Sequence, residues 1–225
     1  MSKFRLEALS DALFAIVLTL LVIEIKIPEL YEKFTEDALL HSLQEKLPLF
    51  FAYFLSFTML ATFWYTHNFL FSLMSKSVTR GLMNLNFIFM AFLSLIPFSS
   101  HLLGQYTQSR VAVAVYSLNI AIMAGLNWWI REYVYSNPKI ENPKFQEVMV
   151  TRKDLVYGTV RVWVGFAGSI LAVAVALIST YISLFVLILQ AFVLIVPGMI
   201  GLVTKLFKLE NMKLRGSLAQ LDIVD

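Results

Sequence analysis

The sequence contains no cysteine, and only 15% of its 225 residues carry a charge. The absence of cysteine excludes disulfides, thiol catalysis and cysteine-ligated metal sites. Hydrophobic residues make up 59% of the chain, whereas a soluble domain usually has roughly 45–50%. A helix that crosses a bilayer needs about 20 consecutive, mostly apolar residues, and the sequence contains several such runs. The composition therefore predicts an all-α integral membrane protein.

Several well-known functional motifs are also missing. The chain has no pair of histidines flanking a glutamate at helical spacing, no G-x-S-x-G, no phosphate-binding glycine loop and no dinucleotide fingerprint. The T-V-G-Y-G filter of ordinary potassium channels and an arginine-rich voltage sensor are absent too. The three histidines, His41, His67 and His101, lie on different segments. We therefore expect no enzyme, no resident cofactor and no metal site.

Six apolar segments are predicted to be transmembrane helices. They are Leu9–Ile25, Leu49–Ser72, Gly81–Leu103, Val111–Ile130, Tyr157–Ile178 and Ser183–Leu206. The first is too long for the apolar part of a signal peptide, so we expect it to be retained. Residues 1–206 are then one transmembrane domain, and residues 207–225 form a cytoplasmic tail. Pro97 and the pair Pro197-Gly198 are expected to bend or end their helices.

The basic residues predict the orientation. With the N-terminus inside the cell, all but four of the 18 Lys and Arg residues fall on the cytoplasmic side, the exceptions being Lys26, Lys33, Lys46 and Arg110. This agrees with the positive-inside rule, so both termini are predicted to be cytoplasmic. The basic pI thus reflects topology, and we expect no nucleic-acid partner. The acidic outer segment Ile27–Lys46 is expected to be a solvated loop or a short surface helix.

The first span, within "RLEALSDALFAIVLTLLVIEIK", has two different sides. At about 100° per residue, four side chains share one stripe of the helix: Ile16, Thr19, Leu20 and Ile23. Ser10 and Asp11 point to the other side. An apolar stripe usually packs against another helix, whereas an ionisable residue within a span is a functional candidate that needs a partner. Asp11 is therefore either a structural tether to a neighbouring helix or part of a functional site.

Partners for Asp11 are available in the next two spans. His67 and Asn68 lie in the cytoplasmic half of the second span, and Asn84 lies near the cytoplasmic end of the third. These side chains should reach similar depth, where a satisfied polar network would hold three helices in register. Trp64 is expected to be an ordinary packing residue. An intramembrane enzyme that uses Asp11 and His67 as an acid–base pair is the alternative interpretation.

At these residues the sequence resembles a known family. Arg5 followed by Leu9-Ser10-Asp11 is similar to the R-x-x-x-F-S-D signature of the Transmembrane protein 175 family of potassium-permeable channels. The segments "FWYTHNFLF" from Phe63 and "NLNFIFMAFLSLIPF" from Asn84 resemble the same family. Leu9 replaces the usual phenylalanine, and Asn68 stands where a second histidine is often found.

The resemblance implies a specific architecture. Animal members carry two six-span repeats and reside in endosomes and lysosomes, so a single repeat implies a prokaryotic member in the bacterial cell (inner) membrane. Four identical chains would then surround a central pore lined by the first helix. Ile16 matches the hydrophobic constriction and Thr19 a pore-lining threonine layer, and Leu20 and Ile23 continue the lining. Arg5, Ser10 and Asp11 match the polar cluster that anchors this helix.

Together, the residues and the resemblance predict a potassium-permeable, leak-type cation channel without a carbonyl filter. A ring of Ile16 side chains would close the pore by dewetting, and Thr19 would give a modest preference for K⁺ over Na⁺. The expected partners are three further copies of the chain, K⁺ and other monovalent cations, and the lipid bilayer. A secondary transporter and a proton-permeable channel remain open as alternatives.

Overall fold

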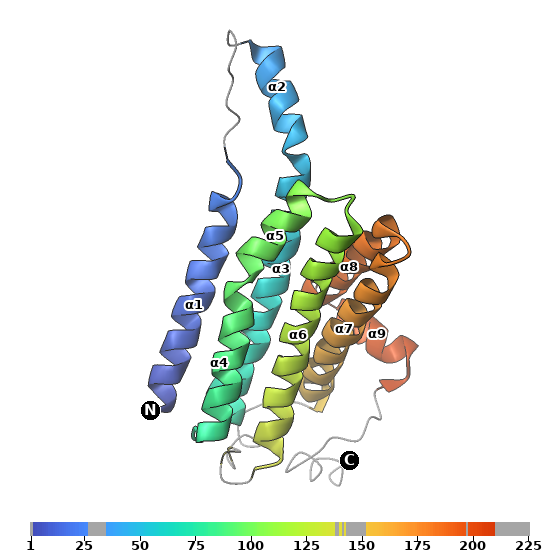
Figure 1. The fold of residues 1–225 in the computed structure, drawn as a ribbon. Helices are drawn as coiled ribbons and strands as arrows, with labels where there is room; N and C mark the ends of the chain where they lie inside the picture. The colour runs from blue at the N-terminus through green and yellow to red at the C-terminus, as the bar shows by residue number, and fades with distance from the viewer. Residues whose placement is uncertain are drawn as a thin grey trace.

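The computed structural model describes residues 2–26, 35–137, 140, 142, 152–196 and 198–209, and the described chain is almost entirely helical (Figure 1). The helices run up and down in one bundle. Their bounds are α1 Lys3–Ile23, α2 Glu36–Glu45, α3 Leu47–Phe69, α4 Arg80–Ser94, α5 Ile96–Gln105, α6 Arg110–Tyr135, α7 Arg152–Ala176, α8 Thr180–Ile195 and α9 Met199–Leu206. A short π-helix, Leu70–Met74, follows α3 directly.

Five helical segments are long and apolar enough to cross a membrane, and a sixth is added if α8 and α9 count as one bent span. This confirms the prediction of a multi-span helical membrane protein. Three helices, α1, α6 and α7, are longer than the predicted spans: α1 begins at Lys3 rather than Leu9, and α7 begins at Arg152 rather than Tyr157. Hydropathy marks only the part of a helix that lies in hydrocarbon, whereas the helix itself continues into its polar end.

Serine and threonine side chains mark where most of these helices begin. The hydroxyls of Ser2, Thr35, Thr79, Ser109 and Ser179 each accept a hydrogen bond from a backbone N–H three residues later. This N-cap contact satisfies one of the backbone donors that the first helical turn leaves free, and typically stabilises a helix by about 1 kcal/mol.

Proline and glycine break two of the spans. Pro97 lies in the first turn of α5, and the chain breaks between α4 and α5 at Leu95, which confirms the bend predicted there. The last predicted span, Ser183–Leu206, is likewise two helices, whose axes differ in direction by 107°. Gly198 precedes α9 with a φ of 85°, a left-handed conformation that glycine adopts without strain. Pro197 lies outside the described residues.

Part of the predicted acidic segment and most of the predicted C-terminal tail fall outside the described part of the chain. Within the acidic outer segment, residues 27–34 are not described, but α2 forms a short helix with no buried residue. Figure 1 shows α2 extending α3 beyond the bundle. Residues 210–225 are also not described, so the predicted boundary between the transmembrane domain and a tail stays a prediction, as does the orientation in the membrane.

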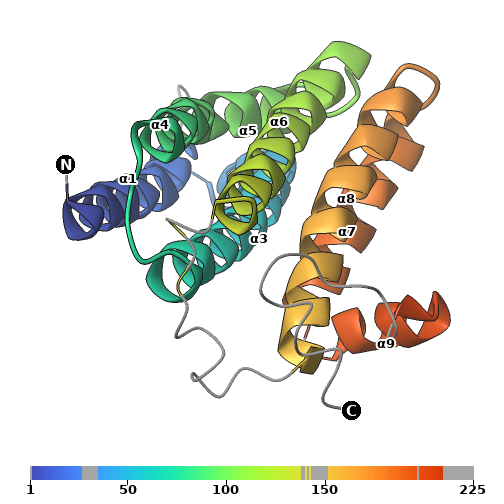
Figure 2. The same ribbon diagram turned by 90° about the horizontal axis from the view of Figure 1, so that it is seen from below.

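The hydrophobic core lies between α3, α4, α5 and α6, with α1 on one edge of the bundle and α7 and α8 on the other (Figures 1 and 2). Toward the end of the bundle where α1 ends, the core contains a small polar cluster. Ser56 donates a hydrogen bond to Ser100 over 2.9 Å and lies 3.1 Å from the hydroxyl of Tyr116, which is fully buried. This cluster ties α3, α5 and α6 together, and α1 packs against that rigid unit.

Candidate functional site: the free face of the first helix

One face of α1 is packed into the bundle. Its members are buried at spacings of three or four residues, as a helix face requires: Leu6, Ser10, Phe14, Val17 and Leu21. Phe14 contacts the rings of His67 on α3 and Phe89 on α4, with centroid distances of 5.8 and 6.0 Å. These contacts fix the rotation of α1 about its own axis.

The opposite face of α1 is free in the single chain. Ile16 is 53% exposed and Ile23 67%, and Leu20 and Thr19 are exposed as well. The structure thus places all four side chains of the predicted stripe on one surface that no part of the described chain covers. A contiguous exposed apolar surface marks a face that meets lipid or another protein chain.

Thr19 is the only polar side chain of this stripe. Its hydroxyl donates to backbone carbonyls of its own helix, 2.8 Å from the oxygen of Ile16 and 3.1 Å from that of Ala15. Because the proton points back into the helix, the oxygen lone pairs face outward. The exposed side of Thr19 is therefore an acceptor surface, suited to a cation or to the water that surrounds one.

A buried hydrogen-bonded chain fastens α1 to α3 and α4. Ser10 is fully buried and accepts a hydrogen bond from Nδ2 of Asn86 over 2.9 Å, and Oδ1 of Asn86 lies 2.7 Å from Nε2 of His67. Ser10 itself donates to the carbonyl of Leu6. Sequence reasoning placed Asn84 in this network. The structure brings Asn86 there instead, and Asn84 is exposed on α4.

Asp11 has a partner that the sequence did not indicate. Nε1 of Trp64 donates to Oδ1 of Asp11 over 3.0 Å, so the tryptophan expected to be a packing residue is a hydrogen-bond donor to the carboxylate. An indole offers a single N–H and no acceptor. In the sequence, only the depth of Trp64 in the membrane pointed to this contact with Asp11, because Trp64 precedes His67 by less than one helical turn.

The remaining predicted residues lie outside this network. Asn68 is half-buried and accepts a hydrogen bond from Ser72 over 3.1 Å, within its own helix. Arg5 is exposed, and its backbone N–H completes the N-cap with Ser2. By helical rotation Arg5 lies on nearly the same stripe as Ile16, three turns toward the N-terminus of α1.

Each end of α1 borders a polar cleft. Near its beginning, a cleft of about 280 Å³ lies between α1 and the end of α3, lined by the polar side chains Glu7, Asp11, His67, Asn68 and Ser72. Beyond its end, Glu24 lies 3.3 Å from Nδ1 of His101 on α5. In the described ranges no three His, Asp or Glu side chains are arranged to hold a metal ion.

Comparison with known proteins identifies the family that this chain resembles. Residues 5–97 match the family model described as "Endosomal/lysosomal potassium channel TMEM175". A potassium channel of Streptomyces collinus is 34% identical over 148 residues, which cover 62% of this chain and 70% of that protein. A potassium channel of Chryseobacterium sp. (strain P1-3) is 29% identical over 197 residues, or 88% of this chain and 94% of the relative.

A solved structure supports the same relationship. The crystal structure of "a lysosomal potassium-selective channel TMEM175 homolog" from Chamaesiphon minutus matches 85% of this chain and 95% of that chain, with 26% identity and a TM-score of 0.69. The animal relatives are described as proton channels. The one from Gallus gallus is 37% identical over 114 residues, but these cover only 22% of that protein.

The fold and these relatives define a multi-pass, all-helical membrane protein of the ion-channel class. The chain belongs to the TMEM175 family of potassium channels. It is a single-repeat member of the bacterial type, a multi-pass protein of the bacterial cell membrane, and its relatives are ion channels rather than enzymes.

Proposed function

We propose that the chain forms a potassium-permeable, leak-type cation channel, in which four copies surround a pore lined by their α1 helices. The observation that carries this proposal is the free face of α1, with Ile16, Thr19, Leu20 and Ile23 exposed opposite a well-packed face. One helix cannot enclose a water-filled path, so several copies must contribute. The number four comes from the resemblance to the family.

The exposed isoleucine at position 16 is proposed as the gate. Four Ile16 side chains that meet at the pore axis would exclude water, and a dewetted constriction blocks ions without touching them. Leu20 and Ile23 would continue the apolar wall toward the outer end. Opening then requires the α1 helices to separate or rotate, and the one-sided packing of α1 on the bundle leaves its pore face unrestrained.

Thr19 is proposed to provide the selectivity of the open pore. Its outward lone pairs could replace part of the hydration shell of K⁺, or orient the water that remains. Four hydroxyl oxygens form a weaker and wider site than stacked carbonyl rings. A modest preference for K⁺ over Na⁺ is the expected result, without a T-V-G-Y-G filter.

The polar groups behind α1 are proposed to hold the pore face in place. The Ser10–Asn86–His67 chain and the Asp11–Trp64 bond fix the rotation of α1. A change of one residue in helical phase turns a side chain by about 100°, which would carry Ile16 away from the axis. Arg5, Asn68 and Asn84 would lie near the cytoplasmic mouth, outside this fastening.

Cysteine accessibility tests the proposed pore face, and the chain is naturally free of cysteine. Thr19→Cys and Ile23→Cys channels in planar bilayers should lose current when a membrane-impermeant thiosulfonate is added to the outer side. Val17→Cys, on the buried face of α1, should be unaffected. Equal insensitivity of all three variants would contradict a pore lined by α1.

Proton permeation is a second candidate. It is favoured by the cleft that Asp11 and His67 line, and by the description of the animal relatives as proton channels. In liposomes loaded with a pH dye, a proton-permeable channel would collapse a pH gradient, and Asp11→Asn would slow the collapse. Potassium current without dye response would restrict the function to metal cations.

The three bacterial relatives are described as potassium channels, which favours both candidates over a secondary transporter.

A further inference from the structure

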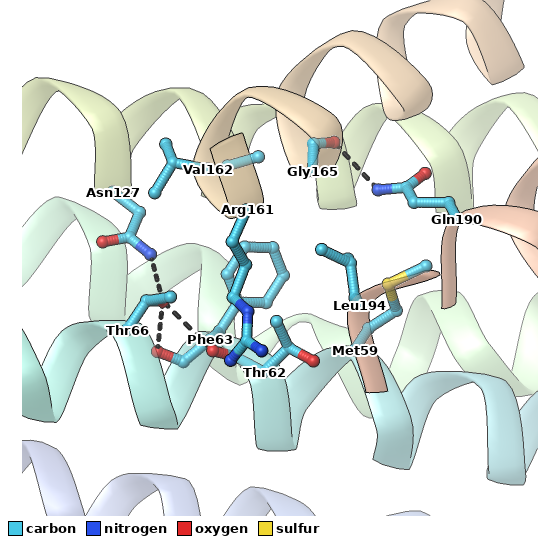
Figure 3. A pocket seen from close by; sticks show the side chains of 11 residues that line it. Met59, Thr62, Phe63, Thr66, Asn127, Arg161, Val162, Gly165, Gln190 and Leu194 are labelled. Atoms are coloured by element: carbon cyan, nitrogen blue, oxygen red, sulfur yellow. Dashed lines mark hydrogen bonds between the residues drawn. The ribbon is translucent and has the colours of Figure 1, made fainter. Parts of the chain in front are cut away.

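Arg161 is a cation within a membrane-spanning helix. It lies on α7, is half-buried, and borders a cleft between α3, α6, α7 and α8 (Figure 3). The cleft is on the side of α3 away from the pore helix, because α7 and α8 form the edge of the bundle opposite α1 (Figure 2). This residue is not explained by the channel function above.

The other polar side chains of this cleft have hydrogen-bond partners within the protein. Asn127 donates to Thr66 over 2.7 Å, and Nε2 of Gln190 donates to the carbonyl of Gly165 over 2.8 Å. The hydroxyls of Thr62 and Thr66 donate to carbonyls of their own helix. In Figure 3 the guanidinium of Arg161 points from α7 toward Thr62 on α3, into the space that these groups border.

The guanidinium of Arg161 has no such partner among the described residues. The guanidinium lies over the ring of Tyr65, whose centroid is 5.0 Å from the guanidinium carbon. Arg131, one helix away, shows the contrast: it is almost fully buried and donates to the hydroxyls of Tyr135 and Thr159. A guanidinium carries five N–H donors, and a charge within a membrane span needs polar or charged partners, which Arg131 has in these two hydroxyls.

The depth of Arg161 indicates what that partner is. The apolar part of α7 begins at Val156, so Arg161 lies roughly 7–8 Å further along the helix at 1.5 Å per residue. Trp64 lies in the second half of α3, and Trp128 and Trp129 lie in the second half of α6. Trp163, near the middle of α7, contacts Trp128 with a ring-centroid distance of 5.5 Å. Tryptophan belts mark the level of the lipid headgroups. Arg161 thus lies within reach of a headgroup phosphate.

We propose that Arg161 and Tyr65 bind the phosphate of an anionic phospholipid, in the leaflet at the end of the bundle where α1 begins. The enclosed space beside the guanidinium is about 20 Å³, room for little more than one water molecule. The phosphate must therefore sit at the mouth of the cleft rather than inside it. A planar guanidinium binds a phosphate through two parallel hydrogen bonds.

Native mass spectrometry of the purified assembly tests the proposal. The wild-type protein is titrated with palmitoyl-oleoyl phosphatidylglycerol or with the matching phosphatidylcholine, and bound lipid is counted per subunit. Phosphatidylglycerol should bind at least about tenfold more tightly than phosphatidylcholine, because the choline ammonium neutralises the phosphate of phosphatidylcholine, whereas phosphatidylglycerol keeps its net negative charge for the guanidinium. Arg161→Gln should remove this preference. Lys205→Gln, the same charge change on the exposed surface of α9, should retain it.

Two further measurements distinguish lost lipid binding from misfolding, and a bound lipid from a bound inorganic phosphate. If Arg161→Gln does not fold, Arg161→Lys keeps the charge but loses the planar pair of donors, and should weaken phosphatidylglycerol binding several-fold. Added inorganic phosphate should not displace the lipid. The proposal is overturned if the wild-type protein shows no preference for phosphatidylglycerol, if the arginine variants keep it, or if inorganic phosphate competes fully.

Discussion

The indole N–H of Trp64 donates to the carboxylate of Asp11 over 3.0 Å and thereby joins α3 to α1. The contact lies outside the packed face of α1, so it adds a second point of attachment at a different angle around the helix axis. Two attachments at different angles resist rotation more strongly than the packed face alone.

Removing this donor should loosen α1. Trp64→Phe keeps an aromatic ring but loses the N–H, and should lower the midpoint of thermal unfolding by a few degrees, as expected for about 1 kcal/mol in a chain of this size. Scanning fluorimetry in detergent measures the shift. Trp129→Phe is the matched control, because Trp129 is exposed at the same end of the bundle. Equal shifts in the two variants would show that the Asp11 contact has no specific effect.

The buried amide of Asn86 should matter more than its exposed neighbour Asn84. Asn86→Ala removes the hydrogen-bond partner of Nε2 of His67 and the donor to Ser10, which keeps its bond to the carbonyl of Leu6. A buried group that loses its partner costs about 1–3 kcal/mol. Asn84→Ala should change the free energy of unfolding by less than about 0.5 kcal/mol, as is usual for a surface position. Denaturation in mild detergent compares the two variants directly. A larger effect at position 84 would contradict the network described above.

A polar side chain at the proposed constriction should wet the pore. Ile16→Asn replaces the dewetting surface with amide groups, so single-channel open probability or conductance should rise. Val22→Asn places the same amide on an exposed position of α1 that lies about 120° away around the helix. It should leave the current unchanged. If Ile16→Asn also behaves like the parent channel, Ile16 is not the gate.

The hydroxyl of Thr19 should set the ion preference. Thr19→Val keeps the shape of the side chain but removes the oxygen, and should reduce the permeability ratio of K⁺ to Na⁺. Thr19→Ser restores the oxygen and should largely restore the ratio. Reversal potentials under mixed-ion conditions give both values. A ratio that is the same in all three channels would exclude a role for this hydroxyl in selectivity.

Helical periodicity was enough to predict the free face of α1, because the spacing of Ile16, Thr19, Leu20 and Ile23 is independent of the other helices. Helical periodicity alone was not enough to predict the partners of Ser10 and Asp11. Asn84 and Asn86 are two residues apart and point about 200° apart on α4, so only one can face α1. Which one does so depends on how α4 is rotated in the bundle, and that is decided by the packing of Leu82, Phe89 and their neighbours.

The hydropathy pattern also could not predict where the helices end. Hydropathy detects the lipid-embedded part of a span, while hydroxyl caps such as Ser2 and Ser109 decide where the helix begins. Pro97 was a reliable signal because proline lacks the N–H that a continuing helix needs. Trp64 was missed because an indole reads as an apolar side chain, although its N–H seeks an acceptor when part of the ring is buried.

The reversal potential of the purified protein in planar bilayers, with K⁺ on one side and Na⁺ on the other, tests the central claim most directly. The account predicts unitary currents that reverse toward the K⁺ equilibrium potential. Folded, oligomeric protein that produces no unitary current, or current that reverses toward the Na⁺ potential, would contradict it.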